Sequence, residues 1–309
     1  MKSIYKTLLI GITAFIAIPM TAQETALEPE QETVQAAQNT ENSFFDGNGG
    51  VIDSNLPTSI DLSERKPIEY NNPRTDDVVW QQVVYRIIDL REKINFPLYF
   101  PILSGDHRQS LFTTIFRLHE QGKIKGFEYE DTREIFTKEK EVKFDDILKK
   151  YGVMITYNID SLSGDTLGQS VDEVDIPNRD VIKYYLKEVW YFDKNNSTYN
   201  VRILAICPKI YTMNNDGALE SNPIAWYPFD MLRPYLAQQE ALLTDANNGA
   251  RETMDDLFIK RKFGSYIYKM SNTRNRNLIE YNVNTEEAHK EQNRIKTMLI
   301  NYEQDLWEY

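Results

Sequence analysis

The sequence predicts an α+β fold, in which an antiparallel sheet combines with short helices. The main observation is a long hairpin, where alternating segments at 180–193 and 198–210 flank a turn of Lys, Asn, Asn and Ser. The helix-like segments between such strands are short, and many of them end at glycine or proline. The chain shows neither a regular βαβ alternation nor a repeat of fixed period, which also indicates the α+β class.

Order is expected to begin near Thr75, and the folded domain is expected to cover 76–284. Its first segment, 75–93, is predicted to be a helix because its apolar residues recur at helical spacing. Two prolines bracket 94–101, so this segment is predicted to be extended. A second helix is predicted over 109–121, ending before Gly122. The apolar positions of the first helix are Val79, Val83, Val84, Ile87 and Ile88.

The remaining elements are predicted from the same two periodicities. Pro234 limits or kinks one of the helices, and the run at 214–217 predicts a tight turn. Helices are predicted at 144–151, 229–239 and 253–263. Further strands are predicted at 123–131, 153–159 and 265–270.

The C-terminal tail, 285–309, is predicted to be a helix with one apolar stripe in its second half. Two interpretations remain open. The stripe either docks on its own domain, or packs against a neighbouring subunit or partner as a helix laid in a groove. The candidate partner interface consists of Ile295, Met298, Leu299, Tyr302, Leu306 and Trp307.

The first 22 residues have the features of a secretory signal peptide. Two lysines precede an apolar run that is too short to span a bilayer comfortably, and Pro19 ends the run. Cleavage is expected after Ala22 or Gln23, and an uncleaved anchor is the alternative. The segment 23–75 is acidic and polar and is expected to be a flexible leader, either a plain linker or one with short docking points.

The composition excludes several classes of protein. With 47 acidic and 35 basic residues the formal net charge is −12, which argues against nonspecific nucleic-acid binding. The single cysteine, Cys207, excludes an internal disulfide framework and a CxxC site. It lies within a predicted strand, so we expect a buried, inert thiol, and an intermolecular disulfide is the alternative.

No catalytic or metal-binding motif emerges from the sequence, so neither a cofactor nor a metal is expected. His119 lies on an apolar helical face and is expected to be a core histidine. The pairs Asp145–Asp146 and Asp255–Asp256 each open a predicted helix, where the helix dipole favours negative charge. Aromatic residues such as Trp190 and Trp226 are expected in the core or an interface, although a sugar-binding platform remains an alternative.

Five segments of the predicted domain are distinctive. The clearest are INFPLYFP at 94–101 and PIAWYPFDMLRPYLA at 223–237, and the others are 108–131, 175–210 and 253–272. These segments resemble the gliding-motility protein N family, called GldN in gliding Bacteroidetes and PorN in their non-gliding relatives. They occur in the family's order after a signal peptide of the expected kind.

This resemblance implies a non-enzymatic subunit of the type IX secretion system. It implies a periplasmic protein that associates with the outer membrane through partners and self-associates within a ring. The implied partners are an outer-membrane lipoprotein, the K subunit (GldK/PorK-like), and the periplasmic region of the motor subunit M (GldM/PorM-like). The alternative is an exported glycan-binding module, or a glycoside hydrolase with an acidic pair in an aromatic cleft.

Overall fold

The structure is a computed structural model of the whole chain. It divides into two units, 1–61 and 62–309, and all the described residues belong to the second. The predicted cleavage point at Ala22 or Gln23, and the leader up to residue 61, lie outside them. The structure describes residue 62 and the ranges 65–105, 108–130, 136–159, 166–213, 219–241, 252–282 and 284–307.

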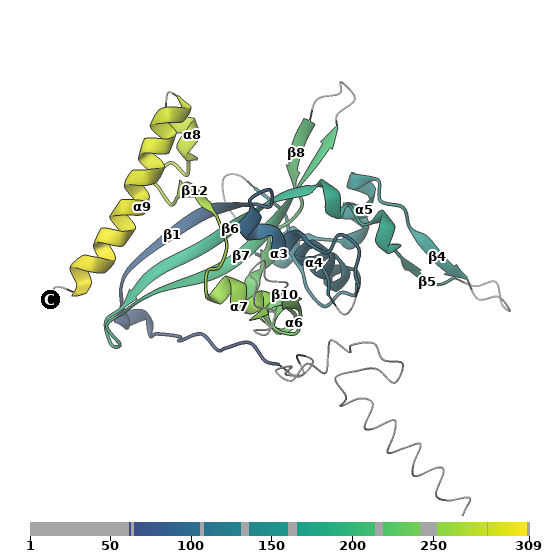
Figure 1. Cartoon of the computed structure of the whole chain (residues 1–309), viewed down its shortest axis with the longest axis horizontal. Helices are drawn as coiled ribbons and strands as arrows, with labels where there is room; N and C mark the ends of the chain where they lie inside the picture. The colour runs from purple at the N-terminus through teal and green to yellow at the C-terminus, as the bar shows by residue number, and fades with distance from the viewer. Residues whose placement is uncertain are drawn as a thin grey trace, which may run out of the picture. The chain divides into compact units, whose positions relative to one another are not determined.

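The centre of the domain is an antiparallel sheet with the strand order β12-β1-β6-β7-β8, and β9 also pairs with β7 (Figure 1). The long predicted hairpin is confirmed as β6 and β7, in which Tyr185 pairs with Cys207. Together with the helices described below, this sheet confirms the predicted α+β class. The strands are β1 (Val78–Asp89), β6 (Val181–Asp193), β7 (Thr198–Met213), β8 (Leu219–Pro223), β9 (Tyr227–Pro228) and β12 (Tyr266–Met270).

The segment 75–93 is not the predicted helix. After a 3-10 turn at Thr75–Asp77 it forms β1, which lies between β12 and β6. Ile88 belongs to the cluster of one sheet face and Ile87 to that of the other. A strand that is buried on both faces carries consecutive apolar residues. Apolar and polar residues then no longer alternate along the strand, and the apolar positions resemble helical spacing.

The segment 94–101 is not extended as predicted. A 3-10 turn at Lys93–Asn95 leads into the single helical turn α3 (Phe96–Tyr99). Pro97 lies in the first turn, where its missing N–H removes no helical hydrogen bond. The amide of Asn95, which is fully buried, donates to the carbonyls of Asp89 and Gly264 at 2.7 and 3.0 Å.

The helices predicted in the middle of the chain are confirmed. Gly122 and Gly152 follow α4 and α5 with φ angles of +66° and +63°, as left-handed C-terminal caps require. Pro234 lies inside α6 without interrupting it, and α7 is shorter than predicted. The helices are α4 (Leu111–Glu120), α5 (Phe144–Tyr151), α6 (Phe229–Leu236), α7 (Met254–Ile259), α8 (Leu278–Tyr281) and α9 (Thr285–Trp307).

Three short hairpins complete the domain. The predicted strand at 123–131 is reduced to β2, and that at 153–159 to β4, while the strand at 265–270 is confirmed as β12. The predicted turn at 214–217 lies outside the described residues. The hairpins pair β2 (Gly126–Phe127) with β3 (Glu141–Val142), β4 (Thr156–Ile159) with β5 (Thr166–Ser170), and β10 (Glu240–Ala241) with β11 (Glu252–Thr253).

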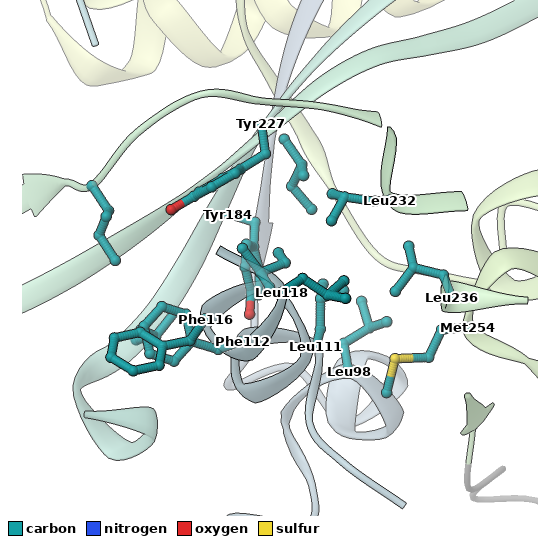
Figure 2. Packing of buried hydrophobic residues seen from close by; sticks show 14 of the residues in the cluster. Leu98, Leu111, Phe112, Phe116, Leu118, Tyr184, Tyr227, Leu232, Leu236 and Met254 are labelled. Carbon is teal, nitrogen blue, oxygen red and sulfur yellow. The ribbon is translucent and has the colours of Figure 1, made fainter. Parts of the chain in front are cut away.

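The main hydrophobic core lies between one face of the sheet and the helices that pack against it. Tyr184 of β6 is fully buried there, and Figure 2 shows side chains from α3, α4, α6 and α7 around it. A smaller cluster on the other face contains Tyr185 and Trp226, which is 1% exposed. Because both faces bury large apolar side chains, hydrophobic burial stabilises the sheet from both sides.

Residues 65–72, which we call the N-terminal strap, contact this domain although they fall within the predicted leader. The ring of Tyr70 lies 4.0 Å from the guanidinium of Arg233 and 4.6 Å from that of Arg202. Arg65 forms an ion pair with Asp256 at 2.8 Å. The described domain therefore begins before the predicted boundary at residue 75.

Candidate functional site

The apolar stripe of the tail faces the protein's own sheet. Ile295 and Leu299 are 1% and 2% exposed, and they share a cluster with Val84 of β1 and Ile267 of β12. Met298 packs against the same cluster and is partly buried. For these three residues, the structure shows the docking alternative, because their side chains contact the domain rather than solvent.

Aromatic stacking extends this contact along α9. Tyr302 stacks on Trp80 of β1 with ring centroids 4.4 Å apart, and its ring lies 6.3 Å from that of Tyr199 in β7. Leu306 and Trp307 belong to the helix, but their side chains lie outside the described residues. Their role as a partner interface stays a prediction.

The histidine that the sequence places on an apolar face is buried and hydrogen-bonded. Nδ1 of His119 lies 3.1 Å from the hydroxyl of Tyr227, and Nε2 lies 3.1 Å from the carbonyl of Val142. Burial lowers the pKa of this imidazole. The interpretation as a core histidine is confirmed, because both ring nitrogens are engaged by the fold.

The single thiol is equally enclosed. Cys207 is fully buried within β7, and it is a free cysteine. Burial raises the pKa of this thiol, which suppresses the reactive thiolate. The expected buried thiol is confirmed. Among the described residues, no group of three or more His, Cys, Asp and Glu side chains could hold a metal ion.

The two acidic pairs have structural roles at helix starts. Asp145 and Asp146 lie in the first turn of α5. Asp256 completes a capping box with Thr253 at the start of α7. Asp255 is buried beside it and accepts from Arg233 Nε at 3.0 Å and Nη2 at 3.1 Å. Thr253 and Arg233 thus engage the side chains of Asp256 and Asp255, and neither carboxylate faces an open cleft.

The aromatic residues considered for a sugar platform, which besides Trp190 and Trp226 include Tyr184 and Tyr227, lie mostly in the interior. Trp226 and Tyr227 are 1% and 3% exposed, and Tyr184 is fully buried. Trp190 is partly buried against the cluster below α9, and its indole N–H donates to Glu188 at 3.1 Å. The expectation that these side chains lie in the core or an interface is confirmed as core for Trp226, Tyr227 and Tyr184, while Trp190 is partly buried.

One open cavity, which we call the acidic groove, combines exposed apolar and acidic side chains. It has a volume of about 480 Å³. It lies where two 3-10 turns that precede β6, Glu173–Asp175 and Asn178–Asp180, meet the loop before β4. Val174, Met154 and Leu103 line it and are 80%, 73% and 51% exposed. Its charged lining residues are Glu173, Asp175, Arg179 and Asp180.

A second cavity, of about 330 Å³, lies beside the loop that follows β12. This arginine loop, 272–276, exposes Arg274 and Arg276, and neither has an ion-pair partner in the described part of the chain. Tyr281 of α8 lines the same cavity and is 44% exposed. The cavity therefore offers two cations beside an aromatic ring.

Comparison with protein families identifies the chain. The model of the gliding motility associated protein GldN matches residues 73–308, which include every strand of the central sheet and the whole of α9. The chain belongs to the GldN family. A search of curated proteins found no match to it.

GldN proteins are components of the gliding motility and type IX secretion machinery, so membership assigns this chain to it. The family match begins just after the N-terminal strap, and it includes both the acidic groove and the arginine loop. Within the described ranges, no helix has both the length and the apolar character needed to cross a membrane.

The acidic groove and the cavity beside the arginine loop were not found from the sequence of this GldN-family protein. The signals were present but weak. Val174 is the one apolar residue in the acidic run Asp172–Asp175, and the loop at 272–276 has two arginines within three positions. An isolated apolar residue between acids and a basic loop are both common on solvated surfaces, so only their placement in three dimensions distinguishes them.

Proposed function

We propose that this chain is a non-enzymatic structural subunit of the type IX secretion system, located in the periplasm and held near the outer membrane by its partners. The observation that carries the proposal is the GldN match over 73–308, which spans the whole described sheet. The signal-like first 22 residues support export across the inner membrane.

The proposed partners are the K subunit, an outer-membrane lipoprotein with which the chain assembles into a ring, and the periplasmic region of the motor subunit M. In this proposal, these partners position the chain at the outer membrane. The acidic groove and the arginine loop supply exposed surfaces of the mixed polar and apolar character that transient interfaces have.

Deletion of the gene tests the proposed function. The deletion strain should retain the substrates of the system inside the cell envelope, and a wild-type copy should restore their release. Normal secretion by the deletion strain would overturn the proposal. As a control, a protein exported by another route should be released equally by both strains.

A tagged copy tests the proposed partners. Purification from solubilised envelopes should recover the K and M subunits in a complex much larger than the monomer. Recovery of the monomer alone would contradict the assembly. Turnover of glycans by the purified protein, lost on replacement of its exposed acids, would instead support the hydrolase alternative and contradict a non-enzymatic role.

A further inference from the structure

We infer that the acidic groove of one copy receives the arginine loop of a second copy of this chain. The inference deepens the proposed function, since it rests on the proposed self-association and names the two surfaces that meet. It identifies a head-to-tail contact in which Arg274 and Arg276 approach Asp175 and Asp180, while Tyr281 enters the apolar part of the groove.

The groove has the chemistry of a receptor site. Asp175 and Asp180 have no ion-pair partner within the described ranges, whereas Glu173 accepts from the backbone N–H of Ser104. Arg179 is the one basic side chain in the lining, so acids exceed bases. The apolar side chains beside them include Val174, which is 80% exposed and is the most exposed large apolar side chain among the described residues. Such a side chain gains most from an apolar partner.

The loop is held in one conformation by its own first residue. Oδ1 of Asn272 accepts from the backbone N–H groups of Arg274 and Arg276 at 3.2 and 3.0 Å. Its amide donates to the carbonyl groups of Met270 and Arg276 at 3.0 and 2.8 Å. These four hydrogen bonds fix the backbone that carries both guanidinium groups, which lowers the ordering entropy lost on binding.

The acids near the loop are already engaged. Glu280 accepts hydrogen bonds from the backbone N–H and the side-chain amide of Asn277, the residue that caps the start of α8. Glu291 accepts two hydrogen bonds from Arg294 at 2.7 and 2.6 Å. The two loop arginines therefore have no carboxylate partner among the residues that the structure describes, although the chain carries a formal net charge of −12.

The two surfaces of a single copy are too far apart to meet. Asp180 directly precedes β6, so the acidic groove lies at the start of this strand. The arginine loop follows Ser271, whose hydroxyl accepts a hydrogen bond from Gln82 of β1. Gln82 pairs with Trp190, which lies near the other end of β6. Nine residues of strand separate these levels by about 30 Å. Two different surfaces that match between copies form a heterologous contact, and such a contact generates a closed ring or an open filament.

Charge reversal with analytical ultracentrifugation tests the inference on the mature protein. The wild type should form concentration-dependent assemblies that dissociate at high salt, since ion pairs are screened. Arg274→Glu/Arg276→Glu and Asp175→Lys/Asp180→Lys should each raise the Kd of self-association by about tenfold or more. An equimolar mixture of the two variants should restore it, because each variant's altered surface is complementary to the other's.

The matched control for the loop variant is Lys66→Glu/Arg74→Glu, which makes the same change of net charge as that variant at two exposed positions outside both surfaces. It should self-associate like the wild type. A wild type that stays monomeric, a loop variant that assembles normally, or a mixture that fails to recover would each overturn the inference. Circular dichroism of every variant separates loss of contact from loss of fold.

Failure of the inference is distinguishable from failure of the proposed function. If the deletion strain cannot secrete but the loop variant assembles and secretes normally, the surfaces are wrong and the secretion role stands. If the mixture of variants restores assembly but the deletion strain secretes normally, the contact is correct and the secretion role is wrong.

Discussion

Tyr302 of α9 stacks on Trp80 of β1, with ring centroids 4.4 Å apart and planes inclined by 26°. The last helix thus lies on the first strand of the described sheet. The tail consequently contributes a layer to the folded domain, and substitutions in its apolar stripe should act on the stability of the monomer.

Leu299→Ala should lower the free energy of unfolding by about 2–5 kcal/mol, because the side chain is 2% exposed in a packed cluster. Ile300→Ala is the matched control. Ile300 is the next residue of the same helix and is 44% exposed, so the change should stay within about 0.5 kcal/mol. Urea denaturation measures both, and equal losses would contradict the docking of the tail.

Arg233→Ala should destabilise the protein by about 3–5 kcal/mol, because it leaves the carboxylate of Asp255 buried without its partner. Removing Lys290, whose ion pair with Glu286 is exposed on both sides, should cost less than about 1 kcal/mol. Thermal unfolding compares the two. A similar small loss for both variants would show that water reaches Asp255.

Stability should depend on pH through His119. Burial lowers the pKa of this imidazole, so the unfolded chain binds a proton at a higher pH than the folded chain. The stabilisation from the neutral ring is fully present above about pH 6.5 and declines as the pH falls toward the folded-state pKa. Denaturation at a series of pH values should show this decline in the wild type and a flatter profile in His119→Gln.

His289→Gln is the control for that experiment, because His289 lies exposed on α9. Its profile should follow the wild type throughout. If the two histidine variants give the same profile, the decline arises from carboxylates and the account of His119 is wrong.

Cys207 should resist thiol reagents in the native protein. The residue is fully buried and burial raises its pKa, so little thiolate is present or accessible. Ellman's reagent should therefore label one thiol per chain in denaturant and almost none without it. Rapid labelling of the native protein would mean that β7 opens locally, or that the thiol is exposed.

The elements that could be predicted are those in which one pattern dominates. The hairpin of β6 and β7 has clear alternation and a polar turn, and α4 and α5 end at glycines with left-handed φ angles. The prediction of a helix over 78–89 was wrong because this segment forms β1, which is buried on both faces. Its many β-branched residues were a signal for a strand, since branching at Cβ lowers helix propensity and suits the pleated sheet.

Some of the candidate site residues could also be predicted from the sequence, and others could not. His119, Cys207 and the acidic pairs could be assigned structural roles because each lies at a position that local rules explain. The acidic groove joins residues near 103, 154 and 174, and no local rule predicts that these three segments meet. The N-terminal strap was missed because its contacts, such as those of Tyr70, depend on single side chains rather than on a periodic pattern.

The position of β1 also determines when the fold can be completed. One neighbour, β12, begins only at Tyr266, so the edge of β1 that it covers stays unpaired until most of the chain is available. Contacts between segments so distant in sequence form slowly, and unpaired strand edges promote aggregation. A chain that ends before this strand should therefore need a chaperone to stay unaggregated.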